Sequence, residues 1–208
     1  MSDAKNIILQ AASELFLEGG TSALSVRAIS KRAGVSTIGI YSHFKGKQGI
    51  LDELYIEGFE KVFLAMDILD INAPARDVIL NGVKGYLTVA DQYEAHYRLI
   101  FGESDAGYSP SEDARAIAKK AFKKLIDVSS LILPEDTKPK EKRRIALEIW
   151  AFIHGYVSLK HHAISTFISP SQWNRLALSA LATHIDAIIA KYAVRGTHSQ
   201  ISNESTAV

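Results

Sequence analysis

The chain has 208 residues, with 24 lysine and arginine side chains against 23 aspartate and glutamate side chains, and a formal net charge of +1. With 47% apolar residues it can bury a core, and with no cysteine it has neither a disulfide framework nor a cysteine-ligated metal site. The N-terminal segment lacks the apolar core of a signal sequence, and no uninterrupted apolar run approaches the ~18 residues of a membrane span. We therefore expect a cytoplasmic protein with no membrane partner.

Apolar residues recur at helical spacing along most of the chain, and no alternating strand pattern is present. The first predicted helix spans about 3–18. A second opens at Ser25, whose hydroxyl can cap it, and ends at Gly34, and a short third opens at Ser36. Six more are predicted, at about 46–69, 74–92, 94–101, 110–133, 140–167 and 171–193. The fold class is all-α, with about nine helices.

Three regions are predicted along the chain. Residues 1–55 form a three-helix domain with a helix-turn-helix, and residues 56–194 form a larger helical domain. Residues 195–208 are polar and without period, so we expect them to be disordered.

The helix-turn-helix region carries the clearest functional signal. From Thr21 to Ile50 there are five lysine and arginine residues and no acidic residue, although the whole chain is nearly neutral. A local basic patch of this kind favours contact with phosphate through one face. Seven apolar side chains are spaced to form one small core beneath it: Phe16, Leu24, Val26, Ile29, Val35, Ile40 and Phe44.

The turn between the second and third helices is suited to DNA. Gly34 stands where a helix ends in a left-handed conformation, which glycine adopts at little cost. Ser36 caps the next helix, whose free N–H groups suit phosphate or base edges. Small residues at its start, Thr37 and Gly39, allow that helix to enter the major groove, which is ~12 Å wide.

A longer pattern covers about the first fifty residues at fixed spacings. It reads Ala11/Ala12, Leu15-Phe16, Gly20, Ile29-Ser30, Ala33-Gly34-Val35-Ser36, Gly39-Ile40-Tyr41, His43-Phe44, Lys47 and Leu51. This pattern resembles the TetR (tetracycline-repressor-type) family of bacterial transcription regulators. The resemblance implies an N-terminal DNA-binding domain of three helices, a fourth connecting helix, and a larger domain for ligand binding and dimerisation.

The resemblance also implies which residues contact DNA. It places three residues of the recognition helix on DNA and three further side chains on phosphates: Ser36, Thr37 and Gly39, then Tyr41, His43 and Lys47. Arg27 is a further candidate for a base or phosphate contact. The apolar Ile38 stands at an exposed recognition position, where it could touch a thymine methyl group. Lys31, Arg32 and Lys45 are interpreted as solvated, and Gly46 and Gly49 depart from the family pattern and predict a weak first turn of the connecting helix.

The larger domain carries weaker signals. Trp150, His154 and Gly155 are similar to the Trp-His-Gly pattern of one C-terminal subclass of the family, as is the segment 95–101. This likeness implies a pocket for a small-molecule effector whose identity stays open. Its predicted lining is aromatic: Tyr93, Tyr97, Phe101, Phe122, Trp150 and His154. For any single one of these side chains, an ordinary place in the core is an equally good interpretation.

The last two predicted helices carry more apolar surface than one small domain can cover. We expect them to pair across a two-fold axis as a four-helix bundle, because Gly155 and several alanines permit close approach. The interface residues predicted are Tyr156, Trp173, Leu181, Ile185 and Ile188. The alternative, that both helices only fill the core of one chain, stays open. A homodimer would place its recognition helices in successive major grooves ~34–36 Å apart, on a palindromic operator.

The seven histidines lack metal-ligand spacing, and no nucleophile motif occurs, so we expect no metal, no cofactor and no enzymatic activity. The sequence predicts a homodimeric repressor that binds double-stranded DNA and is released by a small-molecule ligand. Two alternatives stay open: a helical small-molecule-binding protein without DNA function, and a regulator that activates or does not respond to ligand.

Overall fold

The computed structural model describes residues 3–67, 70, 72–101, 108–160 and 167–204, with side chains described up to residue 193. Within these residues the regular structure is nine α-helices and two short 3-10 turns, without any strand, which confirms the all-α class. The elements are α1 (Asp3–Gly19), η1 (Gly20–Ala23), α2 (Val26–Ala33), α3 (Thr37–Phe44), α4 (Lys47–Asp67), α5 (Ala75–Gln92), α6 (Glu94–Ile100), α7 (Glu112–Ser129), η2 (Ser130–Ile132), α8 (Pro139–Lys160) and α9 (Pro170–Glu204).

The chain forms two compact units, each assembled from two separate stretches of sequence. The first unit comprises Met1–Leu64 and Thr88–Ala121, and the second comprises Ala65–Leu87 and Phe122–Val208. Helices α4, α5 and α7 each contribute residues to both units. The two predicted domains, 1–55 and 56–194, are each one continuous stretch of sequence, whereas each compact unit combines two stretches. As a result, α6 belongs to the same unit as the helix-turn-helix.

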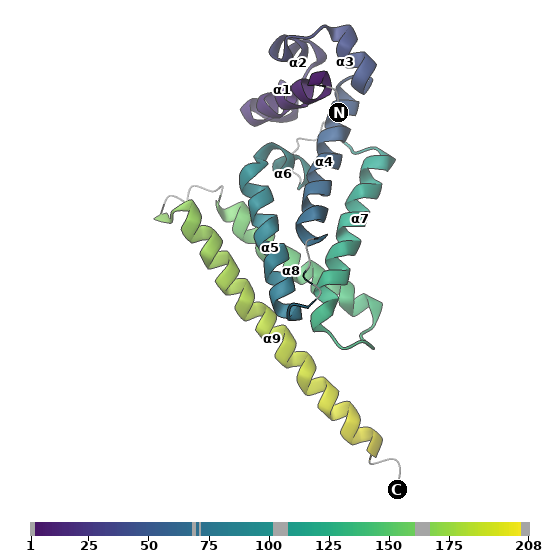
Figure 1. The fold of residues 1–208 in the computed structure, drawn as a ribbon, viewed down its shortest axis with the longest axis vertical. Helices are drawn as coiled ribbons and strands as arrows, with labels where there is room; N and C mark the ends of the chain where they lie inside the picture. The colour runs from purple at the N-terminus through teal and green to yellow at the C-terminus, as the bar shows by residue number, and fades with distance from the viewer. Residues whose placement is uncertain (1–2, 68–69, 71, 102–107, 161–166, 205–208) are drawn as a thin grey trace. The chain divides into compact units, whose positions relative to one another are not determined.

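In the first unit, α1, α2 and α3 gather around the start of α4 (Figure 1) and enclose one hydrophobic core. The seven apolar side chains predicted for this core all belong to it: five are buried, and Val26 and Val35 are partly buried against them. The cluster also contains Ala95 and Leu99 from α6. The predicted core is therefore confirmed and extends to a helix that the sequence assigned to the larger domain.

The helix-turn-helix has the predicted caps. Ser25 Oγ accepts a hydrogen bond from the Ala28 amide, and Ser36 Oγ accepts one from the Gly39 amide, both at 3.1 Å. Between the two helices Gly34 has φ +67°, the left-handed conformation that lets the chain leave α2 and enter the turn. These side chains fix where α3 begins and how its first turn is oriented.

In the second unit α8 packs against α9 (Figure 1), and each helix buries one stripe of side chains within the chain. The stripe of α8 consists of Ile145, Ala146, Ile149, Ile153 and Val157, and that of α9 of Trp173, Ala177, Leu181, Ile185, Ile188 and Tyr192. Arg76 of α5 donates two hydrogen bonds to the Asp186 carboxylate of α9, at 2.6 and 2.9 Å.

The C-terminal helix is longer than the sequence predicted. We expected helix to residue 193 and disorder over 195–208, whereas α9 continues to Glu204 and residues 205–208 lie outside the described residues. No proline follows Pro170, and once a helix is nucleated each further residue adds a hydrogen bond without a new nucleation cost. Lack of period in a segment is therefore not enough to end a helix.

One described helix segment, Ser171–Ala193 in α9, is long and apolar enough to cross a bilayer by length and composition, with mean hydropathy 1.2. This is weak evidence for a membrane span, because the largest apolar side chains of the segment form the stripe that packs within the second unit.

Candidate DNA-binding surface

The residues predicted to contact DNA all lie in the first unit, on α2, α3 and the start of α4. Five of them are exposed, namely Arg27, Ser36, Thr37, Tyr41 and His43, and two are half-buried, namely Gly39 and Lys47. Tyr41 is 57% exposed although its aromatic ring is large. The exposed side of α3 thus presents side chains that the core of the unit does not use.

The inner side of α3 is packed into the core. Ile40 is fully buried and Phe44 is 4% exposed, so these two side chains fix the rotation of the helix about its axis. Ile38 and Tyr41 lie two positions and one position from Ile40, so this rotation turns them toward solvent, and Thr37, one turn before Tyr41, is exposed as well.

The junction between α3 and α4 is built from unusual backbone. Lys45 has φ +57° and Gly46 has φ +110°, so the chain turns sharply between the helices. A Cβ at Gly49 would stand 1.7 Å from the carbonyl oxygen of Phe44, which only a residue without a side chain avoids. From the sequence, Gly49 is interpreted as weakening the first turn of the connecting helix. In the structure, Gly49 lets the first turn of α4 lie directly against the end of α3.

Lys47 links the same junction to η1. Its Nζ donates a hydrogen bond to the Thr21 carbonyl oxygen at 2.6 Å. An ammonium group has three donors, so this bond holds the side chain in place and leaves capacity for a phosphate.

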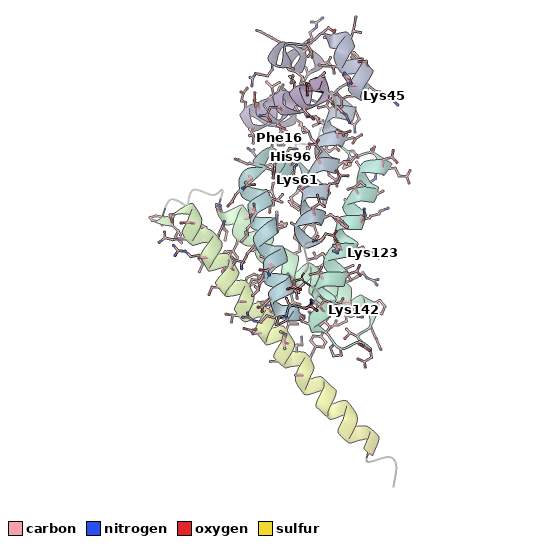
Figure 2. The ribbon with its side chains drawn as sticks, in the orientation of Figure 1. Phe16, Lys45, Lys61, His96, Lys123 and Lys142 are labelled. Atoms are coloured by element: carbon pink, nitrogen blue, oxygen red, sulfur yellow. The ribbon has the colours of Figure 1, made fainter. Side chains whose placement is uncertain are left out.

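The basic patch is partly neutralised within the unit. Arg32 was interpreted as solvated, but its guanidinium donates to both carboxylate oxygens of Glu18 at 2.9 Å and reaches Glu14 at 3.4 Å. The hydrogen bond from Arg32 lowers the pKa of Glu18 below its usual value. Lys31 and Lys45 are exposed, and Figure 2 shows Lys45 at the end of α3, away from the core residue Phe16.

Helix α6 packs directly on α4. His96 Nε2 lies 3.1 Å from the Glu57 carboxylate, and this hydrogen bond is the main reason that the pKa of Glu57 is lowered. A Cβ at Gly58 would come within 2.8 Å of Ile100, so the two helices touch closely there. Neither contact is visible from local sequence, because the partners are about forty residues apart.

The same helix reaches α1. The Arg98 guanidinium lies over the Phe16 ring, 5.9 Å from its centroid, while Figure 2 shows Phe16 and His96 in the same part of the first unit. The core that orients α3 thus includes contacts from α6.

A polar network holds the start of α7 against α4. One oxygen of Asp52 accepts hydrogen bonds from the Tyr108 hydroxyl at 2.9 Å, the Ser111 amide at 3.1 Å and Gln48 Nε2 at 3.2 Å. Burial, together with the Asp52 carboxylate, raises the pKa of Tyr108. Because Asp52 and Tyr108 are far apart in the chain, this network could not be predicted from local sequence.

The six aromatic residues predicted for an effector pocket divide between the units. In the first unit Tyr97 is buried with its ring 4.7 Å from that of Phe101, and Tyr93 is partly exposed beneath Lys61. In the second unit the half-buried Trp150 ring lies 6.2 Å from Phe122 and 6.5 Å from His154. Within the described part of the chain, no three histidine, aspartate or glutamate side chains form a metal-ligand set.

The residues predicted for a dimer interface lie mostly inside the chain. Four of them, Trp173, Leu181, Ile185 and Ile188, are at most 6% exposed, and Tyr156 is half-buried with its ring 6.4 Å from that of Trp173. The large exposed apolar side chains described on the two helices are different ones: Leu147 and Leu159 on α8 and Leu176 on α9.

Comparison with known protein families decides the identity. Residues 8–54 match the family described as bacterial regulatory proteins of the tetR family, and residues 79–181 match the tetracyclin repressor-like C-terminal domain. The chain belongs to the TetR family. This TetR-family chain is a DNA-binding transcriptional regulator, and the family's members are not enzymes. The more specific Trp-His-Gly subclass is not confirmed by these matches.

Solved structures share the fold of this TetR-family chain. A bacterial regulatory protein in the tetR family from Rhodococcus RHA1 is 23% identical, with TM-score 0.67 over 87% of this chain and 98% of that one. A protein of unknown function from Rhodococcus sp. RHA1 is 19% identical, with TM-score 0.68 over 88% and 96%. The MbdR regulator from Azoarcus sp. CIB is 18% identical, with TM-score 0.66 over 86% and 97%. No curated protein matches the chain at a significant level.

Proposed function

We propose that this chain is a cytoplasmic, homodimeric repressor that binds a palindromic operator and leaves it when a small molecule binds. The observation that carries the DNA-binding part is the outer side of α3. Its start is fixed by the Ser36 cap, its rotation by Ile40 and Phe44, and its outer side chains are left exposed. A helix held in this way is suited to the major groove.

The contacts follow from chemistry. Thr37 and Gly39, at the start of α3, approach base edges, while Tyr41, His43 and Lys47 contact phosphates and Arg27 contacts a phosphate or a base from α2. Each cation that neutralises a phosphate releases counterions, so removing it reduces the salt dependence of binding.

The test is the Arg27→Gln variant, measured by fluorescence anisotropy on a duplex selected from random sequence. We expect about tenfold weaker binding, and a slope of log affinity against log salt that is less steep by ~0.9 per half-site. Lys140→Gln, an exposed cation in the second unit, is the matched control and should leave the slope unchanged. An unchanged slope for Arg27→Gln would remove Arg27 from the phosphate contacts, and an unchanged affinity would also exclude a base contact.

We propose that the dimer uses the exposed face of α8 and α9. Leu147, Ala151, Gly155 and Leu159 follow one another at intervals of four on α8 and thus share a face. Among the described residues no atom lies within 4 Å of a Cβ placed on Gly155, so a second helix has room to approach there. On α9 one row of exposed residues at helical spacing is mostly small, which also favours close helix packing: Leu176, Ser179, Thr183, Ala187 and Ala190. Trp173, Leu181, Ile185 and Ile188 then support this face from within the chain.

Sedimentation at micromolar concentration tests the dimer. We expect a dimer for the natural chain and a monomer for Ala187→Glu, since that change adds two charges to an apolar two-fold interface. A wild-type monomer would refute the proposal, and a dimer that survives Ala187→Glu would place the interface elsewhere.

We propose that the effector contacts the aromatic residues of the second unit, Phe122, Trp150 and His154, which are half-buried. Tyr93, Tyr97 and Phe101 belong to the first unit, on and beside α6, so we assign them to the packing of that unit and not to the effector site. The chain has two tryptophans, so Trp173→Phe isolates the fluorescence of Trp150. A compound that quenches this fluorescence and releases the duplex supports a ligand-released repressor. Tighter DNA binding in its presence would favour an activator or corepressed regulator instead.

A further inference from the structure

The recognition helix has unusual chemistry for a helix that reads DNA. Its eight residues, Thr37–Phe44, include no arginine, lysine, asparagine or glutamine. Those four side chains make the common hydrogen-bonded contacts to guanine and adenine in the major groove. Hydrogen bonding of that kind is therefore not available from α3 itself.

Both serines at α3 make a hydrogen bond within the chain, and only Ser36 keeps its O–H donor for a partner. Ser36 Oγ accepts the hydrogen bond from the Gly39 amide, and Ser42 Oγ donates one to the Gly39 carbonyl oxygen at 2.8 Å. Thr37, Tyr41 and His43 remain as the polar side chains on the exposed side of the helix. This leaves few polar groups to specify a base.

Ile38 is the large apolar residue of that exposed side. Its side chain is 80% exposed. Of the other large apolar side chains of α3, Tyr41 is also exposed, whereas Ile40 and Phe44 are buried. Exposing an isoleucine to water is unfavourable, and it lies in the first turn of α3, the part of a recognition helix that meets base edges. The one apolar group in the major groove that marks a base is the C5-methyl of thymine.

We propose that Ile38 determines operator specificity by packing on a thymine methyl group in each half-site. This inference rests on the proposed DNA-binding function and deepens it by naming the base. The first turn of α3 then selects thymine through an apolar contact, and Thr37 and Arg27 supply hydrogen bonds beside it. Loss of one methyl contact should weaken binding about fourfold per half-site, and about 15-fold when both half-sites change, taking ~0.8 kcal/mol for one buried carbon.

The test replaces each thymine of a duplex selected from random sequence by deoxyuridine, one symmetric pair at a time, and measures affinity for the full chain. Deoxyuridine keeps the pairing and the hydrogen-bonding groups and removes only the methyl. For wild type we expect one symmetric pair to cost about 15-fold. Ile38→Ala should bind the thymine and uracil duplexes equally, and Ile7→Ala, an exposed isoleucine on α1, should keep the wild-type difference.

The outcomes separate this inference from the function on which it rests. Tight, sequence-selective binding with every uracil tolerated within about twofold overturns the role of Ile38 and leaves the DNA-binding function standing. A thymine preference that survives in Ile38→Ala assigns it to another residue and likewise overturns the inference. If no sequence is selected from the random pool, both fall together.

Discussion

The α3 region, residues 25–50, and the α8–α9 pair differ in what their buried apolar residues do. Around α3 the buried side chains hold a short helix in one orientation, and the exposed ones are left for a partner. In the α8–α9 pair the largest apolar side chains pack within the chain, and a narrow row of small residues and leucines stays exposed. In both regions, therefore, exposure and not apolar character marks the residues available for a partner.

Gly49 and Gly155 show the difference between a contact within the chain and a face left open for a partner. At Gly49 an added Cβ would meet the Phe44 backbone, whereas at Gly155 it would meet no described atom within 4 Å. Gly49 serves a contact within the chain, and Gly155 stands on the face that we assign to a second copy.

The largest expected effect comes from Gly49→Ala. The clash is with backbone, which cannot rotate aside, so we expect a loss of about 3 kcal/mol in the free energy of unfolding and loss of DNA binding. Chemical denaturation measures it. Gly155→Ala is the matched control and should stabilise one chain by up to ~1 kcal/mol, because alanine favours helix. Equal effects of the two substitutions would contradict the comparison.

Gly39→Ala should separate stability from function. Among the described residues a Cβ there would touch only Ser36 Oγ, at 3.5 Å, an ordinary contact. We expect the free energy of unfolding to stay equal or rise by up to ~1 kcal/mol, and DNA affinity to fall about tenfold because the methyl holds the helix away from the bases. Paired denaturation and anisotropy measurements check this. Unchanged affinity would show that the glycine is not needed for close approach.

The smallest effect concerns the link between α4 and α6. The pKa of Glu57 lies below its usual 4.5 in the folded chain, so its contribution to stability is present above that value and is lost as the pH falls through the folded pKa. Glu57→Gln should lower the free energy of unfolding at pH 7 by about 1 kcal/mol and make it less dependent on pH below 4.5. Denaturation at pH 7 and at acidic pH tests this. A variant with the wild-type acid dependence would contradict the assignment.

The sequence predicted local features well. Ser25, Gly34 and Ser36 act within a few residues of themselves, so their roles as caps and turn could be deduced from spacing. It could not predict Gly49 against Phe44, or His96 against Glu57, because those roles depend on how helices meet in space. For α8 and α9, one apolar stripe fits a core or an interface equally, and only the packed chain shows that Leu181 and Ile185 are buried within it.

The absence of cysteine allows the most direct test of the account, that the start of α3 lies on the bases of the operator. Thr37→Cys would carry an iron chelate that cleaves nearby DNA, with the exposed Lys140→Cys in the second unit as control. We expect two symmetric cleavage sites on a selected duplex from position 37 and no localised cleavage from position 140. Uniform cleavage from both positions would contradict it.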